Sequence, residues 1–344
     1  MENTLSCNPN QAKKNIIRCI KAGLVPFIQS SPGTGKSSIV RQIASEFNLK
    51  LIDHRLSTSD PTDLLGLPHF EEGQAVFSPF RDVFPLEDSP LPQGKDGFLL
   101  FLDEFNSAPR SVQAAAYKLI LDRQVGQHTL HKRCVIVCAG NKLDDNAITV
   151  NLSTAMQSRL VHIIMETDYN SWLQNVAIPE SYDERIVAFL SMYPNFLMDF
   201  EPEKTELTFA CPRTWEFVNK LIKKEPELEA TEWLPLLSGT IASGVAMNFL
   251  NFCKFRNDMI SIQDVLKNPE KALVPELNEA KWATLFHILS NVTEDNFNDI
   301  VDYVERYPAD FRIIFYRSLY IKHPEWSSHP AFVKARTSIG ELLE

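Results

Sequence analysis

The stretch SSPGTGKS (residues 30–37) stands directly between an apolar segment and a helical pattern. The preceding residues VPFIQ (25–29) predict a buried strand, and apolar side chains recur at helical spacing over residues 37–47. A glycine-rich turn in this setting lets backbone N–H groups and the helix N-terminus bind phosphate. We therefore expect Lys36 to neutralise phosphate charge and the Ser37 hydroxyl to hold Mg²⁺. Ser30 departs from the strict pattern, which begins with glycine.

A second motif begins about 60 residues further on, where the apolar run GFLLFL (97–102) ends in two carboxylates. Asp103 is expected to hold Mg²⁺ through water, and Glu104 to polarise the attacking water. Each motif is common in isolation, as a turn that caps a helix or an acidic strand end. Together, and in this order, they predict nucleotide hydrolysis. A small-molecule kinase usually lacks the second acidic residue, because its substrate supplies the nucleophile.

Short apolar runs and helical patterns alternate through the first half of the chain. Further strands are predicted over residues 49–54, 135–139 and 161–165, and a helix over 110–122. Strands that are apolar throughout, without alternating polar residues, are typical of a parallel sheet with both faces covered by helices. Such a sheet is the core of an α/β domain. Residues 66–97 interrupt this alternation of strands and helices. They contain five prolines and four phenylalanines, and we interpret this segment as an ordered loop insertion.

Strand patterns fade after about residue 169, and the second half is predicted to be all-α. Helical patterns cover residues 184–193, 212–224, 233–255, 280–289, 295–306 and 311–320. The aromatic side chains beyond residue 257 are spaced as helix cores and indicate no ligand.

Composition excludes several classes of protein. Hydrophobic residues make up 44% and charged residues 23%, as in ordinary globular proteins. The net charge of −10 disfavours a dedicated nucleic-acid coat, because phosphate binding needs positive charge, although it leaves room for a narrow basic pore. The six cysteines suggest no disulfide framework, and Cys134 and Cys138 are expected to be buried free thiols. With no signal peptide or membrane segment evident, we expect a cytoplasmic protein.

Seven segments resemble the AAA+ ATPases, and within them the MoxR-like branch known from bacteria and phages. They are SPGTGKS (31–37), DPTDLLGLP (60–68), FLLFLDEFNSAPRSVQAA (98–115), DRQVG (122–126), VCAGN (137–141), NLSTAMQSRL (151–160) and CPRTW (211–215). The resemblance covers about residues 20–220. It implies a P-loop AAA+ core with a parallel sheet over residues 1–170, with an insertion at about 60–96. An all-α lid domain over 171–268 and a small helical C-terminal extension over 269–344 would follow.

The resemblance also implies roles for individual residues. ATP would be held by Ser31, Pro32, Gly33, Thr34, Gly35, Lys36, Ser37, Ser38 and Asp103, and Mg²⁺ by Ser37 and Asp103. Asn141 matches sensor 1, which orients the lytic water with Glu104. Arg159 matches the arginine finger, although Leu follows it where the family usually has Phe, and Arg213 matches sensor 2. Arg110 and Arg123 also recur in the branch and are candidates for the subunit boundary, and we assign neither a role.

An arginine finger supplied in trans implies a ring, by family likeness a hexamer. The resemblance implies a protein client delivered by a partner with a von Willebrand factor A domain. Phe70, Phe77 and Phe80 of the insertion are candidate client contacts, with packing onto their own domain as the alternative. The alternative function is a nucleic-acid-associated motor or loader for replication or packaging, which the negative net charge disfavours. A regulatory ATP-binding switch is a third, weaker one.

Overall fold

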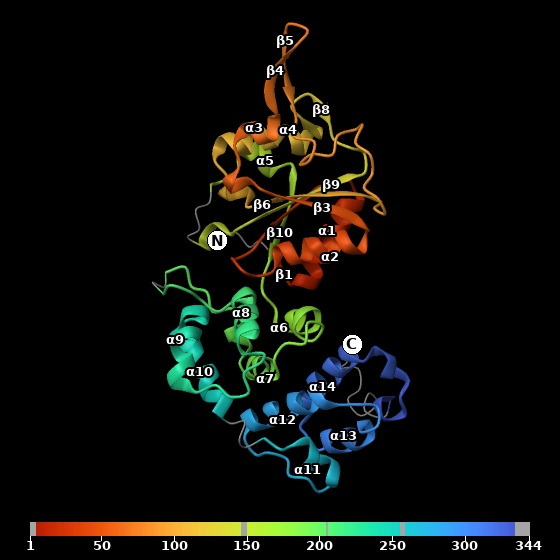
Figure 1. Cartoon of the computed structure of the whole chain (residues 1–344), viewed down its shortest axis with the longest axis vertical. Helices are drawn as coiled ribbons and strands as arrows, with labels where there is room; N and C mark the ends of the chain where they lie inside the picture. Colours follow the sequence, from red (N-terminus) through yellow and green to blue (C-terminus); the bar gives the residue numbers. More distant parts are fainter. Residues whose placement is uncertain (1–4, 146–149, 204–205, 255–258, 334–344) are drawn as a thin grey trace. The chain divides into compact units, whose positions relative to one another are not determined.

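The computed structural model describes residues 5–145, 150–203, 206–254 and 259–333. The chain divides into two compact units. The first unit comprises Met1–Thr167 and Glu201–Lys204, and the second comprises Asp168–Phe200 and Thr205–Glu344. Figure 1 shows a sheet with flanking helices in the first unit and helices in the second.

The first unit is built on one six-stranded sheet. Its strand order is β1 (Ser6–Cys7), β10 (Leu160–Met165), β2 (Val25–Gln29), β9 (Cys134–Gly140), β6 (Gly97–Asp103) and β3 (Leu49–Arg55). Every neighbouring pair is parallel. This confirms the predicted parallel sheet and its five long strands, and adds the short edge strand β1. Since all carboxyl ends lie at the same edge, the loops after β2, β9, β6 and β3 meet there.

Helices cover both faces of the sheet, as the continuous apolar pattern of its strands predicted. Leu99 and Phe101 of β6 pack with α1 (Pro9–Lys21) and α2 (Lys36–Glu46) in one apolar cluster. Phe98, Leu100 and Leu102 lie in a second cluster with α4 (Arg110–Asp122). The unit thus has the AAA fold, a P-loop core with a doubly covered parallel sheet. Helix α1, which we did not predict, begins with Pro9 after an Asn8 cap.

The insertion is more regular than the loop predicted for residues 66–97. After α3 (Pro61–Leu65), β4 (Leu67–Glu71) and β5 (Gln74–Ser78) pair antiparallel in a hairpin that projects from the unit (Figure 1). Phe70 is 82% exposed on this hairpin and Phe77 is 37% exposed, whereas Phe84 after it is fully buried. The hairpin is thus exposed, and the residues after it provide the contact with the core.

The second unit is helical and has a single apolar core. Its helices are α6 (Tyr169–Trp172), α7 (Glu184–Met192), α8 (Pro212–Ile222), α9 (Ala230–Ile241), α10 (Ser243–Lys254), α11 (Ile262–Lys267), α12 (Asn278–Asn291), α13 (Phe297–Val304) and α14 (Ala309–Lys322). One cluster of buried side chains extends from Trp172 to Phe332. The lid boundary at residue 268 stays a prediction.

The single helix predicted over residues 233–255 is wrong. Ala242 has a φ of +69°, which ends α9, and α10 begins at the next residue. The predicted last residue, Phe255, lies outside the described residues. No helix in the described parts of the chain has the length and apolar character needed to cross a bilayer.

Candidate nucleotide site

The glycine-rich stretch forms a loop between β2 and α2, as predicted. Gly33 and Gly35 have φ values of +76° and +94°, which glycine adopts without the strain that a Cβ brings. Helix α2 begins at Lys36, so its unpaired N–H groups and its positive dipole end lie beside the loop. This arrangement fits the phosphates of a nucleotide.

Ser30, which departs from the strict glycine pattern, lies inside the loop. It is fully buried, and its hydroxyl lies 2.5 Å from the Thr34 hydroxyl. Thr34 also donates to the Ser31 carbonyl at 3.0 Å. The Ser30 side chain is thus engaged within the loop, where its hydroxyl also accepts a hydrogen bond from Lys36.

Lys36 connects the loop to the end of β9. Its Nζ donates to the carbonyl oxygens of Ser30 at 2.8 Å and Ser31 at 3.2 Å. It also donates to Oδ1 of Asn141 at 3.2 Å. The candidate phosphate-binding lysine and the candidate sensor residue are therefore in direct contact, although 105 positions separate them in the sequence.

Asp103 brings the second motif to the same place. It is the last residue of β6 and is 7% exposed. Its Oδ2 accepts a hydrogen bond from the Ser37 hydroxyl at 3.2 Å, and its Oδ1 accepts one from the backbone N–H of Glu104 at 2.8 Å. A hydroxyl and a carboxylate at this spacing are the hard oxygen donors that Mg²⁺ prefers. The described residues contain no cluster of three or more His, Cys, Asp or Glu side chains suited to a metal.

Glu104 has a strained backbone and a neighbour that the sequence did not indicate. Its φ is +54°, an uncommon conformation for a residue with a side chain. The Ser57 hydroxyl donates a hydrogen bond to its Oε2. Ser57 lies in the turn directly after β3, the strand next to β6. The sequence could have indicated Ser57 only by its position directly after a predicted strand.

Two further residues at this edge were not predicted. Asn106 is 1% exposed and hydrogen-bonds the backbone of Asn141. Asp145 accepts a hydrogen bond from the Ser31 hydroxyl at 3.2 Å, and burial raises the pKa of its carboxyl. Neither residue type is distinctive in a sequence, because Asn and Asp are common at strand and turn ends.

The two remaining candidate arginines lie on exposed helix ends. Arg159 follows α5 (Thr154–Gln157) in the first unit, and its Nη1 donates to the Ala155 carbonyl at 2.6 Å. Arg213 is exposed in the first turn of α8, in the second unit. Their roles as arginine finger and sensor 2 stay predictions.

The arginines left without a role differ in their surroundings. Arg123, which has a φ of +54°, donates through Nη2 to the carbonyls of His131 at 3.3 Å and of Cys134. These residues follow the short hairpin of β7 (Gln124–Val125) and β8 (His128–Thr129), so Arg123 ties the hairpin to β9. Arg110 is exposed at the start of α4.

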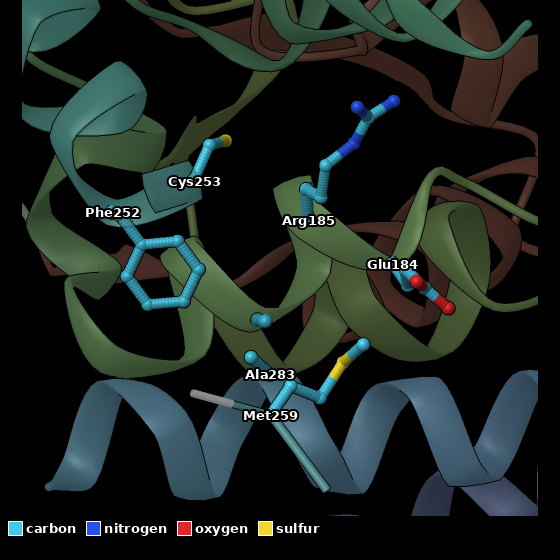
Figure 2. A pocket seen from close by; sticks show the side chains of 7 residues that line it. Glu184, Arg185, Phe252, Cys253, Met259 and Ala283 are labelled. Atoms are coloured by element: carbon cyan, nitrogen blue, oxygen red, sulfur yellow. The ribbon is translucent and has the colours of Figure 1, made fainter. Parts of the chain in front are cut away.

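Figure 2 shows a hollow within the second unit, lined by residues of α7, α10 and α12. Its charged side chains have protein partners. Arg185 pairs with Asp183 at 2.7 Å and donates to the Ile222 carbonyl, while Glu184 lies 3.3 Å from His287. These charges are satisfied within the protein, so we assign no ligand to this hollow.

Comparison with known proteins agrees with the fold of the first unit. Residues 27–160 match the family model described as the AAA domain of the dynein-related subfamily. A search among curated proteins finds no match. The matched segment extends from β2 to the start of β10, so it contains the loop, both carboxylates, Asn141 and Arg159.

Among solved structures, the matches include two of RuvB from Thermotoga maritima. A point mutant is 14% identical over 85% of this chain and 85% of its own, with a TM-score of 0.40. A second, described as the Holliday junction branch migration motor, is 14% identical over 84% of each chain, with a TM-score of 0.37. A structure described as a putative ATPase from Cytophaga hutchinsonii is 14% identical over 90% of this chain and 81% of its own, with a TM-score of 0.36.

Proposed function

We propose that this protein is a MoxR-like AAA+ ATPase that binds ATP with Mg²⁺, hydrolyses it in a ring and remodels a protein client. The observation that carries the proposal is the meeting of five side chains at the carboxyl edge of one sheet. Lys36 contacts Asn141, Ser37 contacts Asp103, and Glu104 follows Asp103 directly. These side chains come from the ends of three different strands and the loops after them. Open α/β sheets bind ligands at the carboxyl ends of their strands.

Each of these groups has a distinct role in hydrolysis. The loop N–H groups and Lys36 bind the β- and γ-phosphates. Ser37 and Asp103 would hold Mg²⁺, which when bound would neutralise charge on the phosphate oxygens. Glu104 accepts a proton from the attacking water, and the Asn141 amide orients that water. A phosphoryl-transfer site depends mainly on such positioning and charge, and all these groups are present.

The position of Arg159 supports the proposed ring. AAA+ proteins oligomerise into rings. Among the described residues, the hydrogen bonds and ring contact of Arg159 are with Ala155, Ser158 and Tyr117, and none of these belongs to the phosphate loop of its own chain. An exposed arginine of this kind suits a γ-phosphate held by the neighbouring subunit, and such fingers accelerate hydrolysis by roughly 10³–10⁵. The number six comes from the family resemblance.

The projecting hairpin of β4 and β5 favours a protein client over a nucleic acid. Phe70 and Phe77 are exposed on it, and exposed aromatic side chains are typical of protein interfaces. Residues 56–80 contain four carboxylates and no lysine or arginine, so this surface repels phosphate. A partner with a von Willebrand factor A domain that delivers the client is implied by the resemblance alone.

ATP turnover measured against protein concentration, with mass photometry of the same samples, tests the shared site. Specific activity should rise steeply as a six-subunit species appears, and flat activity from a monomer would refute both ring and finger. Glu104→Gln should bind ATP but turn it over very slowly, whereas Lys36→Ala should not bind it.

Mixing two impaired variants tests the finger in trans. Lys36→Ala lacks a working site and should be inactive alone, whereas Arg159→Ala lacks the finger and should keep only a slow residual turnover. Random mixing restores both groups at about a quarter of the interfaces, and the mixture should recover activity. A mixture no more active than its components would contradict a finger supplied by the neighbour. Salt-sensitive retention on single-stranded DNA would instead favour the nucleic-acid function.

A further inference from the structure

Arg159 is held against an aromatic ring in its own subunit. The guanidinium carbon lies 5.2 Å from the centroid of the Tyr117 ring, within the range of a cation–π contact. Nη1 of the same group donates to the Ala155 carbonyl at 2.6 Å and to the Ser158 hydroxyl at 3.3 Å. These contacts restrain a side chain that is otherwise exposed at the surface.

Tyr117 is itself firmly placed. It lies on α4 and is half-buried against the apolar cluster that contains Val112, Ala116 and Ile120 of the same helix. The ring is therefore fixed by the core, and its face is available to the guanidinium. An aromatic side chain anchored in this way loses little conformational freedom when it restrains a cation.

The restraining contacts use only part of the guanidinium. Within the described residues, Ala155 and Ser158 are both bound through Nη1, and no hydrogen bond is found from Nε or Nη2. Two parallel N–H groups on one edge are what a phosphate accepts from arginine. The contact with Tyr117 thus leaves the Nε–Nη2 edge available for a phosphate from outside the subunit.

We propose that Tyr117 is a positioning residue that holds Arg159 in the orientation needed to bind the γ-phosphate of the neighbouring subunit. This inference rests on the proposed function, because it requires Arg159 to act as the finger. Tyr117 does not touch the nucleotide. Because the ring already restrains Arg159, the arginine loses less conformational freedom when it binds the γ-phosphate. Tyr117 therefore affects the rate of hydrolysis more than ATP binding.

The test compares Tyr117→Leu, which removes the ring but keeps an apolar side chain, with Tyr117→Phe, which keeps the ring face. At a protein concentration that gives full rings, Tyr117→Leu should lower kcat by about five- to tenfold with an unchanged KM for ATP. Tyr117→Phe should restore kcat to near the wild-type value. Equal kcat for Tyr117→Leu and wild type, or equal loss in both variants, would overturn the proposal.

A double variant separates this proposal from the proposed function. If Tyr117 acts through Arg159, Tyr117→Leu should slow Arg159→Ala no further, because the group to be positioned is already gone. Losses that multiply would place Tyr117 in another role and overturn the inference. Full activity of Arg159→Ala alone would instead remove the finger, and with it the proposed ring mechanism.

If Tyr117→Leu lowers thermal stability, mixed rings can still separate a loss of positioning from a general loss of folding. Arg159→Ala subunits supply intact sites, and Lys36→Ala subunits supply fingers with or without Tyr117→Leu. Activity should fall about five- to tenfold only when Tyr117→Leu is in the finger-donating subunit. The same loss with Tyr117→Leu in the subunit that holds the ATP would overturn the inference. A Tyr117→Met donor, with a flexible apolar side chain, should show the same loss as Tyr117→Leu.

Discussion

The Asn106 side chain binds both backbone polar groups of Asn141. Its Nδ2 donates to the Asn141 carbonyl at 2.7 Å, and its Oδ1 accepts from the Asn141 N–H at 3.1 Å. Asn106 is 1% exposed, so both hydrogen bonds are shielded from water. The residue after β9 is therefore held by the turn after β6, and the Asn141 side chain is directed to Lys36.

Gly140→Ala should disrupt this arrangement. A Cβ at position 140 would lie 2.1 Å from Oδ1 of Asn106, so the amide must move and its buried hydrogen bonds must break. We expect a loss of about 1–3 kcal/mol in the free energy of unfolding, together with a loss of ATP turnover. Urea denaturation and turnover assays measure both.

Gly244→Ala is the matched control, because nothing lies within 4 Å of a Cβ built there. It lies in α10, so alanine should stabilise the helix by up to about 1 kcal/mol. Equal stability of Gly140→Ala and Gly244→Ala would contradict the close packing of Asn106.

Ser57→Ala should raise basal ATP turnover. The Ser57 hydroxyl holds one oxygen of the Glu104 carboxylate at the turn after β3, whereas the proposed role of Glu104 requires its carboxylate to face the attacking water. Removing the hydroxyl frees the carboxylate, and we expect an increase in kcat of up to about tenfold. Steady-state kinetics at saturating ATP give the comparison.

Thr58→Ala serves as its control, because the neighbouring Thr58 is exposed and its hydroxyl bonds only the Arg55 carbonyl among the described residues. It should leave kcat unchanged. A fall in kcat for Ser57→Ala would mean that the serine holds Glu104 in its productive position.

Arg123→Ala should destabilise the first unit. The lost hydrogen bonds leave the carbonyls of His131 and Cys134 without this partner, and we expect a cost of about 1–3 kcal/mol. Thermal unfolding measures the effect. Arg110→Ala removes an equally long but exposed side chain, and its melting temperature should stay at the wild-type value. Equal melting temperatures for both variants would exclude a structural role for Arg123.

The two thiols of strand β9, Cys134 and Cys138, should be protected from modification, and their ionisation should lower the free energy of unfolding at high pH. Burial raises the pKa of Cys134 to about 11, and raises that of Cys138 further. A raised pKa means that the folded state favours the neutral thiol, so this contribution is complete below pH 9 and is lost as the pH rises above it. The free energy of unfolding should therefore fall between about pH 9 and 11.

Alkylation at pH 8 followed by mass spectrometry checks the same assignment. Cys134 and Cys138 should stay unmodified in the native protein and react after denaturation. Modification of either thiol in the native protein at the rate of the unfolded chain would contradict their burial.

Local pattern was sufficient for the main elements of the first unit. The strand at Val25–Gln29 and the helix at Arg110–Asp122 have the predicted bounds, because their apolar patterns are strong and Pro109 marks the start of the helix. The break at Ala242 was not predicted, since its φ of +69° is uncommon for alanine and the nearby Gly239 and Gly244 are not at the position of the break. The exposed hairpin was taken for a loop, because its strands, exposed along nearly their whole length, lack a clear alternation.

The sequence by itself determined which residues form the phosphate loop and the carboxylate pair, because glycines beside a strand and carboxylates after one are local patterns. Only the tertiary structure decided that Asn106 holds Asn141, that Ser57 binds Glu104 and that Tyr117 faces Arg159. These pairs join residues 35 or more positions apart. They meet because parallel strand order and helix packing place their segments side by side, and no local spacing in a single sequence records that order.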